Sequence, residues 1–475
     1  MTLNSFKCAV FFAAVYGLMW VLRLAGEKRR WYNAANKWVL LLASYAFITA
    51  ADWRFSLCLL ALTAVTWICG LRIPGPNGKQ WLTFGVVIAL AQLAVFKYLN
   101  FFLGSFCALL GADEPALRLI VPLGVSFYTF SAVGYLVDVH RGKYPPERDW
   151  AALALFLAFF PKLGSGPLVR ADRFLSQLDG RHTVSRDNFR LGIQLIVRGF
   201  FRKMVLADHL GLFVDSVYAA PTAFAGWTVL LATFAYSLQI YFDFAGYSDI
   251  AIGMARMLGF EFDRNFDLPY LSPNPTLFWK RWHISLSSWL QDYLYISLGG
   301  NRRGARRTEL NLMLTMLLGG LWHGADWSFL LWGGLHGLAL IIHKRFRQAR
   351  KAAGREDSPA WKIATPVLNF LFVNLCWIFF RADSIGHAFR IIGCALRFAP
   401  GIPQAESWFF LALAVALAEI LFAFRRAART GGRPTDPTAV FDFDRIWPTA
   451  LFFVLIGICI MMAYYGDTAF IYGGF

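Results

Sequence analysis

The chain has 475 residues, of which 57% are hydrophobic and 17% aromatic, and its mean hydropathy is +0.49. Soluble domains are about 45 to 50% apolar, so this composition excludes a soluble enzyme and a disordered tail protein. The apolar residues form blocks of about 20, the length that an α-helix needs to cross the hydrocarbon core of a membrane. We therefore predict an all-α, polytopic membrane protein and exclude a transmembrane β-barrel, whose strands would be short and alternating.

The net charge of +17 reflects 46 Lys and Arg against 29 Asp and Glu. In a soluble protein this excess would favour a nucleic-acid partner, but here the basic residues gather in short connectors between apolar blocks. The positive-inside rule expects this pattern in a multi-pass protein, so we predict no nucleic-acid binding. The connector after the first span and the one before the last span are both basic, so we expect both termini outside the cytoplasm. The basic connectors that we assign to the cytoplasm are 27–37, 139–149, 161–190, 299–308, 343–362 and 425–445.

Apolar periodicity predicts about eleven membrane spans. The first block, Phe6 to Leu24, is followed by no small-residue cleavage pattern, which favours a retained span over a signal peptide. The predicted spans are 6–24, 38–51, 55–71, 81–108, 118–138, 226–245, 309–322, 327–343, 361–380, 407–424 and 446–465. Shorter apolar stretches, which we expect to form re-entrant or interfacial helices, lie at 150–160, 190–220, 247–260, 276–298 and 385–398.

Residue spacing signals neither a metal site nor a nucleophilic serine. The seven cysteines are scattered, mostly within apolar runs, and form no CxxC pair, which is typical of small core residues. The HExxH spacing of zinc hydrolases and the GxSxG turn of serine hydrolases are both missing from the sequence. We therefore expect no disulfide framework and no bound metal.

Two carboxylates lie inside an apolar run, at Asp243 and Asp249 of YFDFAGYSDIAIG. Ionisable residues at membrane depth are costly and are functional candidates. We expect a helix break at Gly246 between them, with the carboxylates either bonded to backbone groups of the broken helix or lining a substrate channel. Other segments rich in glycine and proline also predict broken backbone that protein or water must shield. They are 161–167, 269–275 and 319–324.

Histidine is the side chain best suited to proton transfer near neutral pH. Most of the eight histidines lie in basic loops or amphipathic stretches, where we expect them to be solvated. These are His140, His182, His209, His343 and His387. The others lie in strongly apolar surroundings, at His283, His323 and His336. For His336 we favour simple helix packing.

His323 is the strongest single candidate because it ends an apolar span within GGLWHGADW, where glycines let a substrate or another backbone approach closely. It is either a general base or a structural histidine bonded to a neighbouring helix. His283 lies in WKRWHISLSSWLQDYLY, beside Lys280 and Arg281. That segment is either part of a site or an interfacial helix with snorkelling cations.

The segment NFDLPYLSPNPTLFWKRWHISLSSWLQDYLYISLGGNRRG, followed by LTMLLGGLWHGADWSFLLWGGLHG, resembles the membrane-bound O-acyltransferase (MBOAT) family. It is most similar to the branch of bacterial alginate and peptidoglycan O-acetyltransferases. The runs PLGVSFYTF, PKLGSGPLVR and YFDFAGYSDIAIG extend the resemblance over most of residues 80–380. The joint occurrence of WKRWH and LWHG makes the resemblance specific.

The resemblance implies a ring of tilted transmembrane helices, with re-entrant and interfacial helices, around a thinned central funnel. It implies one membrane domain over residues 1–475, with a catalytic core at 80–380. His323, in LWHG, is the implied catalytic residue, and His283 matches a second polar position that is asparagine or histidine in the family. The implied chemistry is acyl transfer from a thioester to a hydroxyl, for which His323 would be the base.

The implied donor is cytoplasmic acetyl-CoA, and the implied product is an O-acetylated extracytoplasmic polysaccharide such as alginate or peptidoglycan. A periplasmic SGNH-type acetyltransferase or esterase is the implied partner, and the bacterial inner membrane is the implied location. The basic residues that we expect to meet the phosphates of the donor, from their charge and their side of the membrane, are Lys280, Arg281, Arg302 and Arg303.

The chain ends in TAFIYGGF, within an expected extracytoplasmic tail at 466–475. This ending resembles the C-terminal motif of related acylation systems, which implies that Tyr472 is a transient acyl carrier. Gly473 and Gly474 depart from the bulkier polar pair expected there, and the tail is otherwise an aromatic anchor at the interface. Two other functions stay open: D-alanyl transfer to teichoic acid, and a glycan or lipid transporter, which would need no base and no carrier tyrosine.

Overall fold

The computed structural model describes residues 3–26, 29, 31–112, 119–164, 166–179, 184–354, 358–398, 400–432 and 441–466. Within these ranges the chain is helical and contains no strand, only an isolated parallel bridge between Phe224 and Ile402. The prediction of an all-α chain is confirmed. The helices form two compact units, Met1–Ile196 with Tyr247–Asp263 and Val197–Gly246 with Arg264–Phe475.

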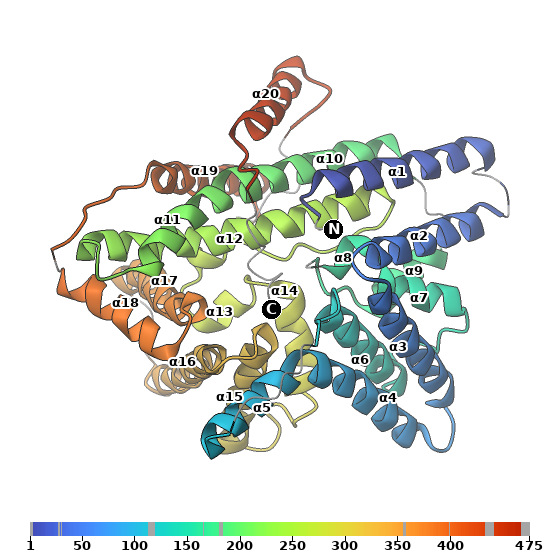
Figure 1. Ribbon diagram of the computed structural model, residues 1–475, viewed down its shortest axis with the longest axis horizontal. Coiled ribbons are helices and arrows are strands. Elements are labelled where there is room, and N and C mark those ends of the chain that lie inside the picture. Colours follow the sequence, from blue (N-terminus) through green and yellow to red (C-terminus); the bar gives the residue numbers. More distant parts are fainter. Residues whose placement is uncertain are drawn as a thin grey trace. The chain divides into compact units, whose positions relative to one another are not determined.

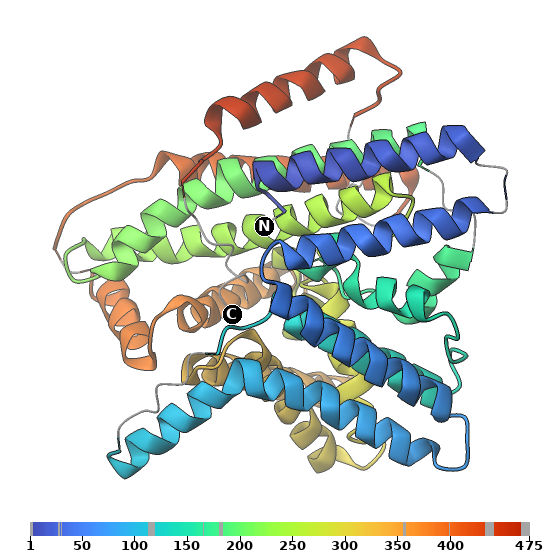
Figure 2. The same ribbon diagram turned by 45° about the vertical axis from the view of Figure 1, so that its right-hand side comes forward.

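The first unit holds the long apolar helices of the N-terminal part. Helices α1 and α2 lie side by side, and α4 packs against both α3 and α6 (Figures 1 and 2). Asp52 begins α3 by accepting a hydrogen bond from the backbone N–H of Arg54 at 2.9 Å. Its elements are α1 (Phe6–Gly26), α2 (Trp31–Thr49), α3 (Trp53–Arg72), α4 (Gly78–Leu93), η1 (Ala94–Tyr98), α5 (Leu99–Leu110), α6 (Val125–His140), α7 (Trp150–Ala158), α8 (Phe160–Leu163), α9 (Ala171–Asp179) and most of α10 (Arg186–Phe200).

The second unit holds every residue of the candidate site. Within it, α15 and α16 form an antiparallel pair, and α17 packs against α16 (Figure 1). Its elements are η2 (Phe201–Ala207), α11 (Asp208–Ala219), most of α12 (Gly226–Met257), η3 (Pro269–Leu271), α13 (Pro275–Trp279), α14 (Ile284–Trp289), η4 (Leu290–Tyr295), α15 (Ala305–His323), α16 (Trp327–Ala352), α17 (Pro359–Arg381), α18 (Ile385–Arg397), α19 (Ser407–Thr430) and α20 (Ile446–Met462). The elements η2 and η4 are π-helical turns, which occur frequently at functional sites.

Six of the described helices are long and apolar enough to cross a membrane. They are Phe6–Gly26, Trp53–Arg72, Gly78–Leu110, Gly226–Met257, Pro359–Arg381 and Ser407–Thr430. Each of the other predicted ranges also coincides with a helix, but with one that is shorter or more polar. The chain is therefore a multi-pass membrane protein, while the number of eleven spans stays a prediction.

The predicted break at Gly246 is wrong, because α12 runs without interruption from Gly226 to Met257. A Cβ at Gly246 would lie 2.7 Å from the carbonyl oxygen of Gly199, so this glycine permits close helix packing. Asp243 is held in an ion pair with Lys203 at 2.5 Å, since a buried carboxylate needs a compensating charge. The stretch 247–260, predicted to be a separate re-entrant helix, begins with the last turns of α12.

A second correction concerns the connector 343–362. Helix α16 continues through its first residues as far as Ala352. His343 therefore lies within a helix, half-buried and lining a cavity, and not at the edge of a loop. The cause is the composition of 343–352, whose lysine, arginine, glutamine and alanine are strong helix formers as well as topological signals.

Candidate active site

His323 lies at the last position of α15, where that helix turns into α16. The two helices approach closely because glycines face each other: a Cβ at Gly320 would overlap the carbonyl oxygen of Phe329, and one at Gly333 that of Met316. Small residues permit this kind of close approach between helices. Asp326 then starts α16 by accepting a hydrogen bond from the Ser328 N–H at 2.7 Å. The motif GGLWHGADW therefore places its histidine at a tight turn between two closely packed helices.

Aromatic rings surround the imidazole of His323, which is only 3% exposed. The ring centres of Trp322 and Trp332 both lie 5.0 Å away, and that of Phe380 lies 5.3 Å away. All three contacts are edge-to-face, a favourable geometry for aromatic pairs. The shell holds the imidazole in a low-dielectric environment, where its interactions with a reacting group are strengthened.

His283 is held by the segment before α13, through Asn265. The carbonyl oxygen of Asn265 accepts a hydrogen bond from the backbone N–H of Ile284, at 2.9 Å. Its side-chain Oδ1 accepts from the hydroxyl of Ser285, at 2.9 Å, and lies 3.2 Å from His283 Nδ1. His283 itself has φ of +42°, a strained value for a residue with a side chain. Strain of this kind persists only where the surroundings hold it, and it is frequent at active sites.

The Asn265 contact determines which nitrogen of His283 carries the proton. Asn265 Oδ1 is an acceptor, because the Ser285 backbone N–H also points at it, at 3.2 Å. His283 Nδ1 must therefore donate, which leaves the lone pair on Nε2. His283 is 0% exposed and lies outside the six long apolar helices; burial lowers its pKa to about 3, so it is neutral at physiological pH.

The two histidines meet at one indole. The ring of Trp322 lies 5.0 Å from that of His323 and 6.0 Å from that of His283, centre to centre. Phe244, from α12, also packs edge-to-face on His283, at 4.6 Å. The structure thus brings together two residues that are far apart in sequence and that the motifs single out separately.

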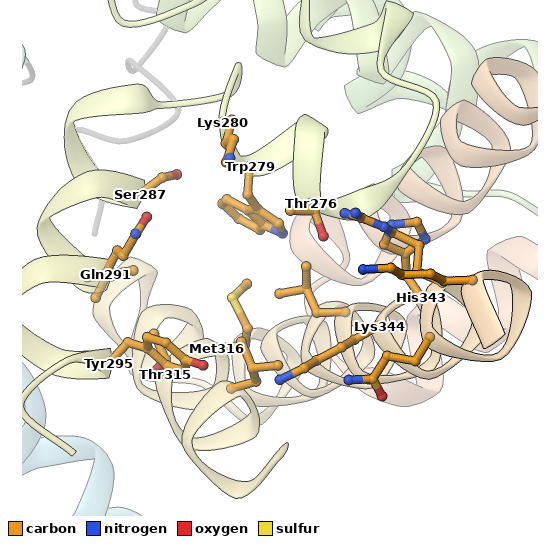
Figure 3. A pocket seen from close by; sticks show the side chains of 16 residues that line it. Thr276, Trp279, Lys280, Ser287, Gln291, Tyr295, Thr315, Met316, His343 and Lys344 are labelled. Carbon is orange, nitrogen blue, oxygen red and sulfur yellow. The ribbon is translucent and has the colours of Figure 1, made fainter. Parts of the chain in front are cut away.

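A cavity of about 430 Å³ lies in the same unit, between α13, α14, η4, α15 and α16 (Figure 3). Its lining includes apolar and aromatic side chains, among them Trp279, Tyr295 and Met316. It also includes basic side chains, from the residue after α13 and from the last turns of α16. These basic residues are Lys280, His343, Lys344, Arg347 and Lys351. Such a pocket suits a ligand with an anionic end and a less polar remainder.

The structure places the four predicted donor-binding residues differently. Lys280 lines the cavity, whereas Arg281, Arg302 and Arg303 are not among its lining residues. The backbone carbonyl of Arg281 accepts a hydrogen bond from the Asp267 N–H, and the side chains of Arg302 and Arg303 are exposed. Tyr472 lies outside the described residues, so its role stays a prediction.

The sequence pattern does not point to two sets of residues in the site. Nothing in the local pattern joins Asn265 to His283, eighteen positions later. The charge of the basic residues at the end of α16 favours a loop. Their spacing did contain a signal, since positions 340, 343, 344, 347, 348 and 351 repeat every three to four residues, as one helix face does.

Comparison with known proteins places this site in a family. The model of the membrane-bound O-acyltransferase family matches residues 148–385. The chain is 42% identical over 375 residues to the probable alginate O-acetylase AlgI of Azotobacter vinelandii, covering 76% of this chain and 72% of that protein.

Two further relatives are also O-acetylating enzymes by name. The probable alginate O-acetylase AlgI of Pseudomonas aeruginosa is 41% identical over 390 residues, covering 79% of this chain and 71% of that protein. The peptidoglycan O-acetyltransferase of Helicobacter pylori is 33% identical over 383 residues, covering 74% and 72%. The matched region includes both histidines and the cavity, and the chain belongs to the membrane-bound O-acyltransferase family as an O-acyltransferase.

Proposed function

We propose that this O-acyltransferase moves acetyl groups from cytoplasmic acetyl-CoA across the bacterial inner membrane, for O-acetylation of an extracytoplasmic polysaccharide. The names of its relatives, alginate O-acetylases and a peptidoglycan O-acetyltransferase, support acetyl as the group and a polysaccharide as its destination. The observation that carries the proposal is the buried, aromatic-enclosed His323 in the same unit as a cavity lined by basic residues.

His323 acts as the general base in this proposal. An acceptor hydroxyl attacks the thioester carbonyl carbon while the imidazole takes the hydroxyl proton, so that a C–O bond forms. The C–S bond then breaks, and the coenzyme A thiolate takes that proton from the imidazolium. Base catalysis of this kind contributes about 10²- to 10⁴-fold to a rate. His283, which is neutral and bears its proton on Nδ1, supplies a second polar contact to the reacting groups.

The basic residues that line the cavity receive the phosphates of the donor. Lys280, Lys344, Arg347 and Lys351 supply charge from two segments, and charge-assisted contacts to phosphate are roughly twice as strong as neutral ones. The acceptor hydroxyl is that of Tyr472, which passes the acetyl group to a periplasmic SGNH-type partner on the outer face. Arg281, Arg302 and Arg303 remain candidates for weaker, long-range attraction of the donor.

The test is labelled acetyl transfer by purified protein, comparing wild type with His323→Ala. We expect His323→Ala to lower the rate about 10²- to 10⁴-fold, at unchanged protein level, and mass spectrometry to find acetyl on the C-terminal peptide of the wild type but not of His323→Ala. His140→Ala, at the end of α6, is the matched control and should transfer normally. Undiminished transfer by His323→Ala would contradict the assignment of His323 as the general base. Labelling by a D-alanyl carrier protein instead of acetyl-CoA would show a different donor.

A further inference from the structure

Three aromatic rings with unsatisfied nitrogens gather between α13 and α16. The ring of His336 lies 5.0 Å from Trp279 and 4.9 Å from Trp332, and the two indoles are 5.7 Å apart, centre to centre. His336 is 0% exposed, yet among the described residues neither of its ring nitrogens has a hydrogen-bond partner. The indole nitrogens of both tryptophans are also buried without a partner there. Buried polar atoms are nearly always satisfied, so such a cluster demands an explanation.

The cluster adjoins the cavity through Trp279 and His323 through Trp332. Leu340 is the first residue of α16 that lines the cavity. His336 lies one helical turn before Leu340 on the same helix face, and Trp332 lies one turn before His336. Trp279 belongs to the cavity wall itself. Trp332 in turn packs against His323 at 5.0 Å. One face of α16 therefore runs from Lys351 and Arg347, past His336, to the candidate base, over about 28 Å at 1.5 Å per residue.

The hydrogen-bonding capacity of the cluster identifies the group that it fits. Two indoles supply two N–H donors, and a neutral imidazole adds one donor and one acceptor. A secondary amide meets three of these four groups, because its carbonyl oxygen accepts from two of the N–H donors and its own N–H donates to the imidazole acceptor. A thioester carbonyl offers acceptors alone, and so satisfies the indoles but leaves the imidazole acceptor unmet. Between the phosphates and the thioester of an acyl-CoA lies a pantetheine arm with two secondary amides.

We propose that His336, with Trp279 and Trp332, binds a secondary amide of the pantetheine arm and so sets the depth at which the thioester reaches His323. This assignment rests on the proposed acyl-CoA donor. It gives His336 a substrate-binding role in place of the helix packing expected from its sequence context. Phe278 and Phe372 complete the box around the imidazole, at 6.0 and 5.4 Å, and keep it dry.

The experiment measures binding of S-acetonyl coenzyme A, a non-transferable analogue, to the purified full-length protein. His336→Phe keeps a ring but removes both nitrogens, and we expect it to raise the Kd about threefold to thirtyfold. His336→Gln retains one donor and one acceptor and should recover most of the affinity. His387→Phe makes the same substitution on α18, where the imidazole bonds the Tyr218 carbonyl at 2.8 Å, and should leave the Kd unchanged.

A second acetyl donor distinguishes amide recognition by His336 from a purely structural role of this residue. Ethyl thioacetate carries the thioester but no amide, so His336→Phe should use it as well as wild type does, while its KM for acetyl-CoA rises. Equal losses with both donors, or an unchanged Kd for the analogue, would overturn the amide site while leaving the acyl-CoA donor intact. Failure of the wild type itself to bind the analogue would overturn the donor and the amide site together. Weakened binding of acceptor oligosaccharide alone would reassign the cluster to the sugar.

Discussion

At the residue scale, the two central histidines are held in opposite ways. His323 has aromatic neighbours on several sides, while His283 is oriented by a hydrogen bond to Asn265 and by a strained backbone. The first arrangement encloses the imidazole in aromatic rings, which suits a group that exchanges a proton with a substrate. The second fixes a tautomer, which suits a group that orients a substrate by hydrogen bonding.

This difference predicts the behaviour of His283→Asn. Because burial lowers the pKa of His283 to about 3, the imidazole stays neutral from about pH 5 to pH 9 and an asparagine can replace its polar contact. We expect His283→Asn to retain transfer within about tenfold, and His283→Ala to lose about 10²-fold through misplacement of the reacting groups. The measurement is kcat/KM against pH, whose acid limb should coincide for wild type and His283→Asn. A shifted limb would mean that His283 itself titrates during the reaction.

At the element scale, the pairing of α15 with α16 determines where His323 lies. Gly320 and Gly333 bring the two backbones together, and any side chain at Gly333 would collide with the Met316 carbonyl. The position of the base is therefore sensitive to changes that touch neither the base nor the cavity.

Adjacent glycines on α16 provide a matched pair for testing this. Gly333→Ala should force the helices apart, lowering the free energy of unfolding by about 1 to 3 kcal/mol and reducing transfer. Gly334→Ala should be nearly neutral, because its Cβ would meet only the Leu317 side chain, at 3.5 Å. Thermal unfolding in detergent and acetyl transfer are the measurements. Equal effects of the two substitutions would show that helix propensity, and not helix approach, decides the outcome.

At the scale of the whole molecule, the basic connectors assign a direction to the chemistry. The loop 299–308 is expected in the cytoplasm and the tail 466–475 outside, so an acetyl group that reaches Tyr472 has crossed the membrane. The inner membrane and this orientation are proposals, supported by the six apolar helices and the distribution of Lys and Arg.

Cysteine labelling tests the orientation. In a variant with all seven native cysteines replaced by serine, a membrane-impermeant thiol reagent added to intact spheroplasts should label Asp113→Cys and Gly474→Cys. Arg302→Cys should react only after the membrane is permeabilised. Labelling of Arg302→Cys in intact spheroplasts would show that the topology is the opposite of the one proposed. The direction of transfer would then be reversed as well.

The sequence by itself determined the class of protein and the identity of the best catalytic candidate. The length of the apolar blocks matches the thickness of the hydrocarbon core, and the glycines of GGLWHGADW indicate that two backbones approach closely. Both signals are local in sequence, so they can be interpreted without the fold. Helix ends are not determined in this way: the pattern around Gly246 predicts a break, whereas this glycine lies within α12 and permits close packing against Gly199.

Only the tertiary structure decided which distant residues meet. Asn265 reaches His283, Lys203 pairs with Asp243, and Trp322 touches both histidines through helix packing that local periodicity does not encode. The same holds for the cavity, whose walls come from several short elements, and for the buried nitrogens of His336, Trp279 and Trp332. Hydrophobic burial is non-directional, so sequence pattern shows that a helix is buried, while the shapes of its neighbours decide what it is buried against.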